Sequence, residues 1–233
     1  IVNFNFPENH LWRSRATASH HNQAAPNMVL VYVRKDASEA SRWGTELGVQ
    51  GGYDSVDFAF LPGEKKVGGA DVLRHVHRAN ASYLAPLGNG MTITAGLFNS
   101  LLGYESLYAK DNANYTRAWI ADYTPYMMFG INAKYPVNEN FAVAAFVING
   151  YAHLSHPNDQ PSYGVQWAYK ITPRLTATQT TYWGPDQTKT SLEFWRLYGN
   201  HILEWKGDDV TVALSYDIGT ESIANQPGNP RTF

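Results

Sequence analysis

A two-residue alternation of side-chain chemistry recurs along this chain and constrains its fold more than any other feature. In SYGVQWAYKI (162–171), every second residue from Tyr163 is apolar, and the residues between are small or polar. Side chains on a β-strand point alternately to opposite faces, so this segment predicts a strand with one apolar and one polar face. The same alternation, strong or weak, predicts about eleven strands at 28–35, 43–53, 55–61, 72–84, 91–98, 127–135, 141–150, 162–171, 174–184, 193–205 and 209–219.

The links between these strands alternate in length. Short turns are predicted at 53–55, 86–90, 136–140, 172–173 and 206–209, and longer polar links at 36–42, 62–71, 99–126, 151–161 and 185–192, with another long link opening after Gly219. Antiparallel up-and-down strands, with turns at one rim and loops at the other, produce this order, and membrane barrels have that asymmetry. A Greek-key sandwich has no reason to keep it.

The composition of the two rows indicates which face meets water. The polar rows are rich in Gly, Ser, Thr, Gln, Asn and Ala, and charged residues are 16% of the chain, below the roughly 25% of soluble domains. Small uncharged polar residues suit a crowded aqueous lumen. The apolar rows carry aromatic residues near strand ends, where membrane barrels place them at the lipid headgroups. These candidate interface aromatics are Trp43, Tyr53, Tyr135, Tyr163, Tyr169, Trp183 and Trp205.

Three simple observations exclude other classes of protein. The chain has no cysteine, which rules out disulfides and thiolate metal sites. No apolar run approaches the ~20 residues of a membrane-spanning helix. The net charge of −2 gives no electrostatic case for nucleic acid.

Several segments resemble the OmpL-like β-barrel porins of Gram-negative outer membranes. The similarity begins at NFNFPENHLWRSR (3–15), is most specific at GLFNSLLGYES (96–106), and continues through PYMMFGINAKYPVNENF (125–141), FVINGY (146–151) and SYDIG (215–219). The resemblance implies an all-β, antiparallel up-and-down transmembrane β-barrel in the bacterial outer membrane. It also implies passive diffusion of small hydrophilic solutes or ions, without enzymatic activity or a cofactor.

The whole chain, 1–233, is predicted to be a single barrel domain. Bacterial barrels close with even strand numbers, so about eleven strands predict an incomplete part of a larger even-numbered barrel. The resemblance implies that further strands follow where this chain ends at QPGNPRTF, and the ending is expected to lie inside a long loop.

Charged residues in the lumen and any loop folded inward are the expected working parts of a porin. The link 99–126 is the longest, and NYTRAWIADY (114–123) within it predicts a short helix. We hypothesise that this link enters the lumen and narrows it, with Glu105 and Arg117 near the constriction; an ordinary surface loop is the alternative. The other pore-lining candidates lie on or beside the polar rows: Arg34, Glu46, Arg74, Arg78, Lys134, Lys170 and Arg174. Their mostly positive sign favours anions.

Two alternatives to a porin stay open on the residues alone. Alternating strands with aromatics also occur in soluble all-β carbohydrate-binding modules, which need no detergent. A barrel enzyme such as an outer-membrane lipase or protease is the second, although no GxSxG motif marks a nucleophile. His75 and His77 share a strand face, but zinc requires three or four ligands and no third is identifiable, so no metal site is expected. The expected partners are outer-membrane lipid and small solutes, and the oligomeric state, trimers included, is left open.

Overall fold

A single antiparallel sheet accounts for nearly all regular structure in the computed structural model, which describes residue 24 and residues 26–57, 73–154, 160–185, 194–223 and 226–232. The sheet has eleven strands within these ranges, and their order in space follows the chain. The strands are β1 Val29–Lys35, β2 Trp43–Gly51, β3 Val76–Ala85, β4 Met91–Asn99, β5 Met127–Pro136, β6 Phe141–Ile148, β7 Ser162–Thr172, β8 Leu175–Pro185, β9 Trp195–Lys206, β10 Thr211–Ile223 and β11 Gln226–Thr232. The predicted all-β, up-and-down antiparallel architecture is confirmed.

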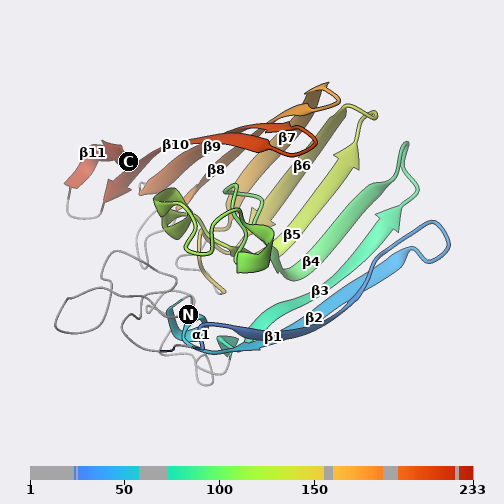
Figure 1. The fold of residues 1–233 in the computed structure, drawn as a ribbon. Helices are drawn as coiled ribbons and strands as arrows, with labels where there is room; N and C mark the ends of the chain where they lie inside the picture. Colours follow the sequence, from blue (N-terminus) through green and yellow to red (C-terminus); the bar gives the residue numbers. More distant parts are fainter. Residues whose placement is uncertain are drawn as a thin grey trace.

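The sheet curls into a deep trough, with β1–β3 along one wall and β8–β10 along the other (Figure 1). Within the described ranges the sheet is open, because β1 pairs only with β2 and β11 only with β10. The right-handed twist of neighbouring strands produces this curvature, and the same curvature closes membrane barrels.

The predicted strand at 55–61 is wrong. Asp54–Asp57 form a single helical turn, α1, and residues 58–61 lie outside the described part of the chain. The hydroxyl and the backbone N–H of Ser55 both donate to the carbonyl of Gly52, at 2.7 and 3.1 Å. Local hydrogen bonds of this kind compete with strand pairing. None of the described helical segments is long and apolar enough to cross a membrane.

Without a strand at 55–61, one link between strands lies at the opposite rim of the sheet from the one predicted. The link 36–42, predicted among the long loops, lies at the same rim as the short turns 86–90, 137–140, 173–174 and 207–210. The long link predicted after Gly219 is also wrong, because β10 runs on to Ile223 and β11 follows at Gln226–Thr232. The ending QPGNPRTF is therefore mostly strand rather than loop.

The short turns depend on residues that tolerate unusual backbone geometry. In the turn 86–90, Gly88 and Gly90 have φ values of 52° and 90°, a region that only glycine enters without strain. The side-chain amide of Asn89 donates to the carbonyls of Pro136 and Val137 at 3.1 and 2.8 Å. These hydrogen bonds connect the turn 86–90 to the neighbouring turn at 137–140.

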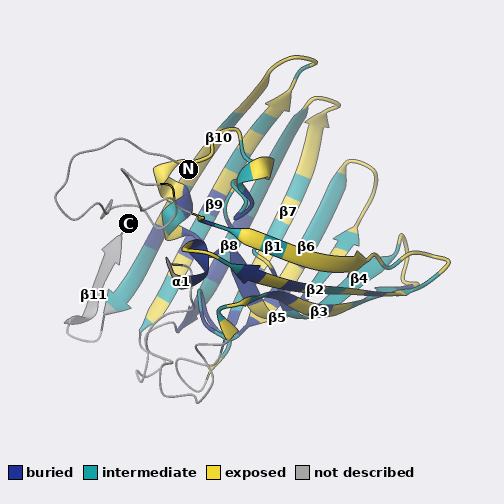
Figure 2. Cartoon of the chain, turned by 60° about the horizontal axis from the view of Figure 1, so that its bottom comes forward, coloured by how far each residue is buried: buried dark blue, intermediate teal, exposed yellow. Residues whose placement is uncertain are grey.

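The two faces of the sheet have opposite chemistry. Cross-strand partners share a face, and one such row runs Lys134, Ala144, Gln166, Thr180, Asn200 and Asp217 across β5–β10 on the concave side. The convex side displays large apolar residues to the surroundings, such as Val33 at 71% exposure and Leu214 at 67%. Exposed residues recur along most strands (Figure 2). A continuous exposed apolar face marks contact with lipid or another apolar partner.

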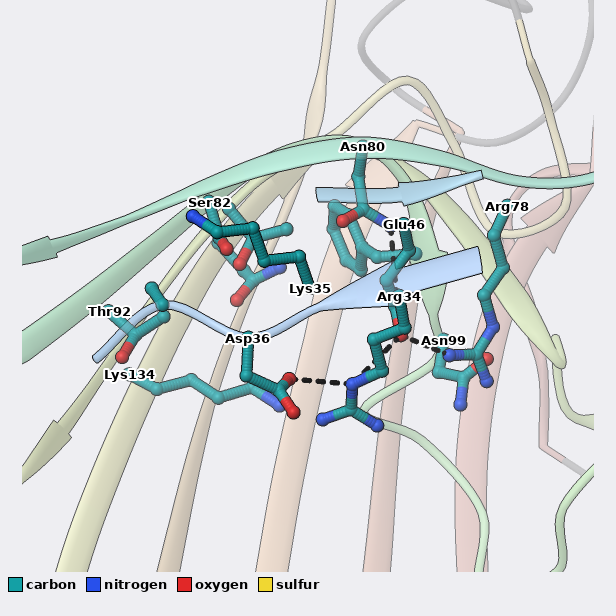
Figure 3. Close-up of a pocket in the computed structure, with 14 residues that line it drawn as sticks. Arg34, Lys35, Asp36, Glu46, Arg78, Asn80, Ser82, Thr92, Asn99 and Lys134 are labelled. Atoms are coloured by element: carbon teal, nitrogen blue, oxygen red, sulfur yellow. Dashed lines mark hydrogen bonds and ion pairs between the residues drawn. The ribbon is translucent and has the colours of Figure 1, made fainter. Parts of the chain in front are cut away.

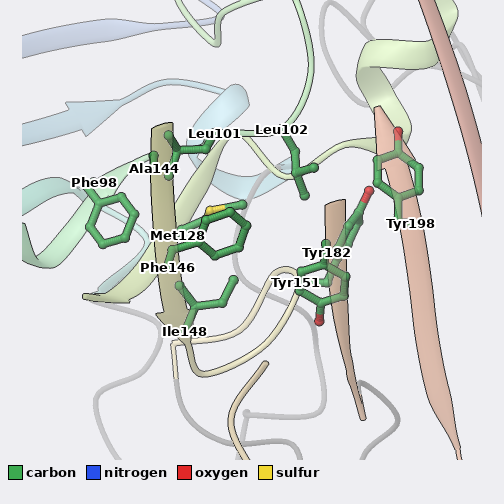
Figure 4. Close-up of a cluster of buried hydrophobic side chains, with 10 residues drawn as sticks. All are labelled: Phe98, Leu101, Leu102, Met128, Ala144, Phe146, Ile148, Tyr151, Tyr182 and Tyr198. Atoms are coloured by element: carbon green, nitrogen blue, oxygen red, sulfur yellow. The ribbon is translucent and has the colours of Figure 1, made fainter. Parts of the chain in front are cut away.

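Part of the concave face is nevertheless apolar. Ten buried side chains form a cluster there, drawn in Figure 4: Phe98, Leu101, Leu102, Met128, Ala144, Phe146, Ile148, Tyr151, Tyr182 and Tyr198. Leu101 and Leu102 belong to the β4–β5 loop, so the loop packs against the concave face of the sheet through this hydrophobic cluster. The ring of Phe146 lies over Gly164, where a Cβ would come within 2.0 Å of it, so glycine makes room for the ring.

Candidate functional site

The candidate site is the concave face of the sheet together with the β4–β5 loop, residues 100–126. Five of the charged residues singled out from the sequence lie on strand positions of that face: Arg34, Glu46, Arg78, Lys134 and Lys170. The pairing Arg34–Glu46–Asn80 places three polar side chains side by side on β1, β2 and β3. The strand alternation is the physical reason for their common orientation.

The structure brings four of these residues together around one hollow, which we call the basic recess (Figure 3). Its volume is about 470 Å³. The lining comes from β1–β5 and their links: Arg34, Lys35, Asp36, Ala37, Glu46, Arg78, Asn80, Ser82, Thr92, Thr94, Phe98, Asn99, Asn132 and Lys134. The recess opens to solvent on the concave side.

Glu46 is the centre of an ion-pair network in this recess. Its carboxylate accepts from the guanidinium of Arg78 at 2.7 Å and from the amide of Asn80 at 3.2 Å, and Arg34 lies 3.5 Å away. Arg34 also donates to Asp36 at 2.6 Å. The side chains of Arg78 and Glu46 are only 7% and 17% exposed, so each offsets the desolvation of the other.

Arg78 is held from a second direction by aromatic rings. Its guanidinium lies 5.7 Å from the ring centre of Tyr32 and 5.0 Å from that of Tyr108, within the range of cation–π attraction. The ring of His77 lies 5.1 Å from Tyr108. Because Tyr108 belongs to the β4–β5 loop, this stack attaches the loop to the wall formed by β1 and β3.

The other attachment of the loop is a set of hydrogen bonds to β7–β9. The carbonyl of Leu101 accepts from Gln166 at 2.7 Å and from Thr180 at 2.9 Å. Tyr104 donates to Glu204 at 2.8 Å. These strand residues lie on the concave face, so the loop crosses the trough from wall to wall, as the green segment in Figure 1 shows.

Burial raises the pKa of the Tyr104 hydroxyl to about 12, and its hydrogen bond to Glu204 acts in the same direction. This hydroxyl therefore stays protonated, and able to donate to Glu204, to a higher pH than an ordinary tyrosine does. Burial likewise raises the pKa of Tyr108 to about 12.

The two loop residues chosen for the constriction make contacts within the loop. Arg117 is 6% exposed and donates to the carbonyls of Ser106, at 2.9 Å, and Leu107. Its φ of 60° is uncommon for a residue with a Cβ, and those hydrogen bonds help to hold it there. The carboxylate of Glu105 accepts from the backbone N–H of Ala118 at 2.7 Å. Arg117 is thus placed to stabilise the loop, whereas Glu105 also lines a second hollow.

That second hollow, of about 340 Å³, separates the loop from β10. Glu105 lines it on the loop side and Asp217 on the sheet side, and Asp217 accepts from the amide of Asn200 at 2.5 Å. The trough therefore has a cationic hollow by β1–β5 and an acidic hollow by β10, with the loop between them. The sequence alternation already placed Asp217 on a polar row, but nothing in the sequence pointed to Tyr108.

The remaining predicted residues lie away from this centre. Lys170 is exposed on the concave face of β7, nearer the turn rim. Arg174 lies in the β7–β8 turn, where its guanidinium contacts Asp208 at 2.9 Å. Arg74 precedes β3, which starts at Val76 rather than near residue 72, so its expected place on the strand beside Arg78 is wrong.

The loop contains two short 3₁₀ turns, η2 at Ala109–Asp111 and η3 at Trp119–Tyr123. The short helix predicted within 114–123 corresponds to η3. Among the parts of the chain that the structure describes, no three histidine or acidic residues lie close enough together to hold a metal ion.

The predicted interface aromatics stand near the ends of strands. Trp43 begins β2, Tyr163 is second in β7, and Trp205 is next to last in β9. Tyr163 and Trp183 are cross-strand partners whose rings stack at 6.0 Å. Tyr53 follows β2, and Tyr135 and Tyr169 lie toward the turn-rim ends of β5 and β7. Two levels of aromatic residues result, one toward each rim.

An up-and-down sheet with an apolar outer face, aromatic residues toward both rims and a polar concave face has the design of a membrane β-barrel. Residues 1–233, the whole chain, match the family described as Putative beta-barrel porin-2, OmpL-like, and the chain belongs to this family. No curated protein and no solved structure matches the chain.

Proposed function

We propose that this protein is an outer-membrane porin through which small hydrophilic solutes or ions diffuse passively. One observation carries the proposal: the convex face displays apolar side chains such as Val33 and Leu214, while the concave face carries Arg34, Lys134 and Asp217. An arginine or lysine side chain facing lipid at mid-depth costs about 2–4 kcal/mol, and an acidic side chain somewhat less. The distribution of charge therefore favours lipid outside and water within.

The β4–β5 loop narrows the route that a solute takes. It is attached to both walls of the trough, through Tyr108 on one side and Leu101 and Tyr104 on the other. Cationic residues of the basic recess and acidic residues near β10 then flank the route. Opposite charges across a narrow passage set a transverse field, which tunes the passage of ions.

Permeability of lipid vesicles tests this function. The protein is reconstituted into vesicles, and swelling is followed in neutral sugars of increasing size. We expect entry of monosaccharides that falls steeply as the sugars grow, because the loop restricts the passage. Vesicles prepared without protein are the control. Swelling no faster than in that control, or protein that stays monodisperse in buffer without detergent, would contradict the proposal.

A further inference from the structure

The basic recess has an excess of positive charge that its own carboxylates do not match. Arg34, Lys35, Arg78 and Lys134 contribute four positive charges, and Asp36 and Glu46 two negative ones, which leaves a net charge of +2. The two arginines are engaged by the carboxylates, and Lys35 donates to Ser41 and to the carbonyl of Trp43. Within the described ranges, no ion pair or hydrogen bond occupies the ammonium of Lys134. One free cation therefore faces the hollow.

The recess also contains hydrogen-bonding groups that the described residues leave unused. Asn132 is 3% exposed, and its side-chain oxygen has no hydrogen-bond partner there. A buried acceptor without a donor costs free energy, which a ligand or a water molecule supplying that donor recovers. The hydroxyls of Ser82, Thr92 and Thr94 line the same hollow and form no hydrogen bond with any described side chain or backbone group.

The recess has a volume of about 470 Å³ and opens into the trough. This is enough for a single sugar ring with its substituents. A longer chain would extend out of the recess along the trough.

We propose that the basic recess is a binding site for a sugar acid, meaning a single sugar carrying one carboxylate. The carboxylate lies against Lys134, and the hydroxyls of the sugar exchange hydrogen bonds with Asn132 and with Thr92 and Thr94. The single free ammonium of Lys134 matches one carboxylate in charge. The proposal rests on the proposed pore, since the site would lie along its route and select among the solutes that pass.

Blocking of chloride current through the protein in a planar bilayer tests the site, with glucuronate, acetate and glucose as probes. We expect glucuronate to block at millimolar concentration. Acetate and glucose should block only at much higher concentrations, because acetate lacks the sugar hydroxyls and glucose lacks the carboxylate. Lys134→Gln is expected to weaken the glucuronate block about five-fold. Thr94→Val, which removes a hydroxyl at nearly constant volume, should weaken it about three-fold without affecting acetate.

Lys170→Gln is the matched control. It removes the same charge from an exposed lysine on the concave face of β7, outside the recess, and should leave the glucuronate block as in the parent protein. Equal block by glucuronate and acetate, or equal effects of Lys134→Gln and Lys170→Gln, would overturn the site.

Saturation-transfer NMR of glucuronate with the protein in micelles separates the site from the pore. If Lys134→Gln weakens glucuronate binding in a protein that carries no current, the result would support the site and reject the pore. A protein that conducts and shows no Lys134-dependent binding would keep the pore and reject the site.

Discussion

Replacement of Glu46 by alanine is expected to lower the free energy of unfolding by about 3 kcal/mol, because it leaves a buried guanidinium without its counter-charge. Glu46 accepts from Arg78 at 2.7 Å and from Asn80 at 3.2 Å. The Arg78 side chain is 7% exposed, so water does not readily replace the lost carboxylate. The two tyrosine rings that flank Arg78 cannot substitute for a full negative charge.

The measurement is unfolding from lipid vesicles in guanidinium chloride, followed by tryptophan emission. Asp208→Ala is the matched control, because it also removes a carboxylate from an arginine, at the exposed pair Arg174–Asp208 with 53% and 81% exposure. An exposed pair of this kind contributes less than about 1 kcal/mol. Equal losses for the two variants would show that the Glu46 network is not buried as described.

Replacement of Gly96 by alanine is expected to cost about 3 kcal/mol or to prevent folding. Gly96 has a φ of 117°, and a Cβ built there would lie 2.2 Å from the carbonyl oxygen of Ala79 on the neighbouring strand. Both the backbone conformation and the close approach of β3 therefore exclude a side chain. The cross-strand partner of Gly96 is Gly130, so two glycines stand opposite each other at this point of β4 and β5.

Gly51→Ala is the control for the Gly96 variant. A Cβ at Gly51, the last residue of β2, meets nothing within 4 Å, and the change should alter the free energy of unfolding by no more than about 0.5 kcal/mol. The fraction of each variant that folds, scored by the shift between heated and unheated samples on gels, provides the comparison. A Gly96 variant that folds as well as the Gly51 variant would contradict the close approach of β3 to β4.

The strands were largely predictable from the sequence, because alternation is a local property that the pleat of a strand imposes. The strand 162–171 corresponds to β7 at Ser162–Thr172, and 91–98 to β4 at Met91–Asn99. The prediction failed at 55–61, where the weak alternation is overridden by the hydrogen bonds of Ser55 to Gly52. Because of that error, the link 36–42 was predicted at the rim of the long loops, whereas it lies at the rim of the short turns.

The concave strand charges follow from the same alternation, and Arg34, Glu46, Arg78, Lys134 and Lys170 all lie on the expected face. Their partners could not be predicted, because pairing depends on register between strands. The loop was the hardest part. Its contacts with Gln166, Thr180 and Glu204 join residues 65 to 100 positions apart in the chain.

One signal in the sequence indicates where the loop packs on the sheet. Phe98 and Met128 are large apolar residues on strand rows that otherwise hold small or polar ones, and both are buried in one cluster with Leu101 and Leu102. Apolar residues on the polar row of a barrel strand indicate that something packs inside the lumen at that level. The position of Arg117 within the loop depends on backbone carbonyls, which leave no trace in a sequence pattern.

The central claim, lipid on the convex face and water on the concave face, can be tested most directly by single cysteines along β10. The chain contains no cysteine, so each introduced thiol reports alone. Ala213 and Ser215 lie on the concave row and Leu214 and Tyr216 on the convex row. In reconstituted vesicles, we predict that thiols at 213 and 215 react with a charged, membrane-impermeant reagent, and that fluorophores at 214 and 216 are quenched by brominated acyl chains. Equal behaviour of the two rows, or the reverse pattern, would contradict the account.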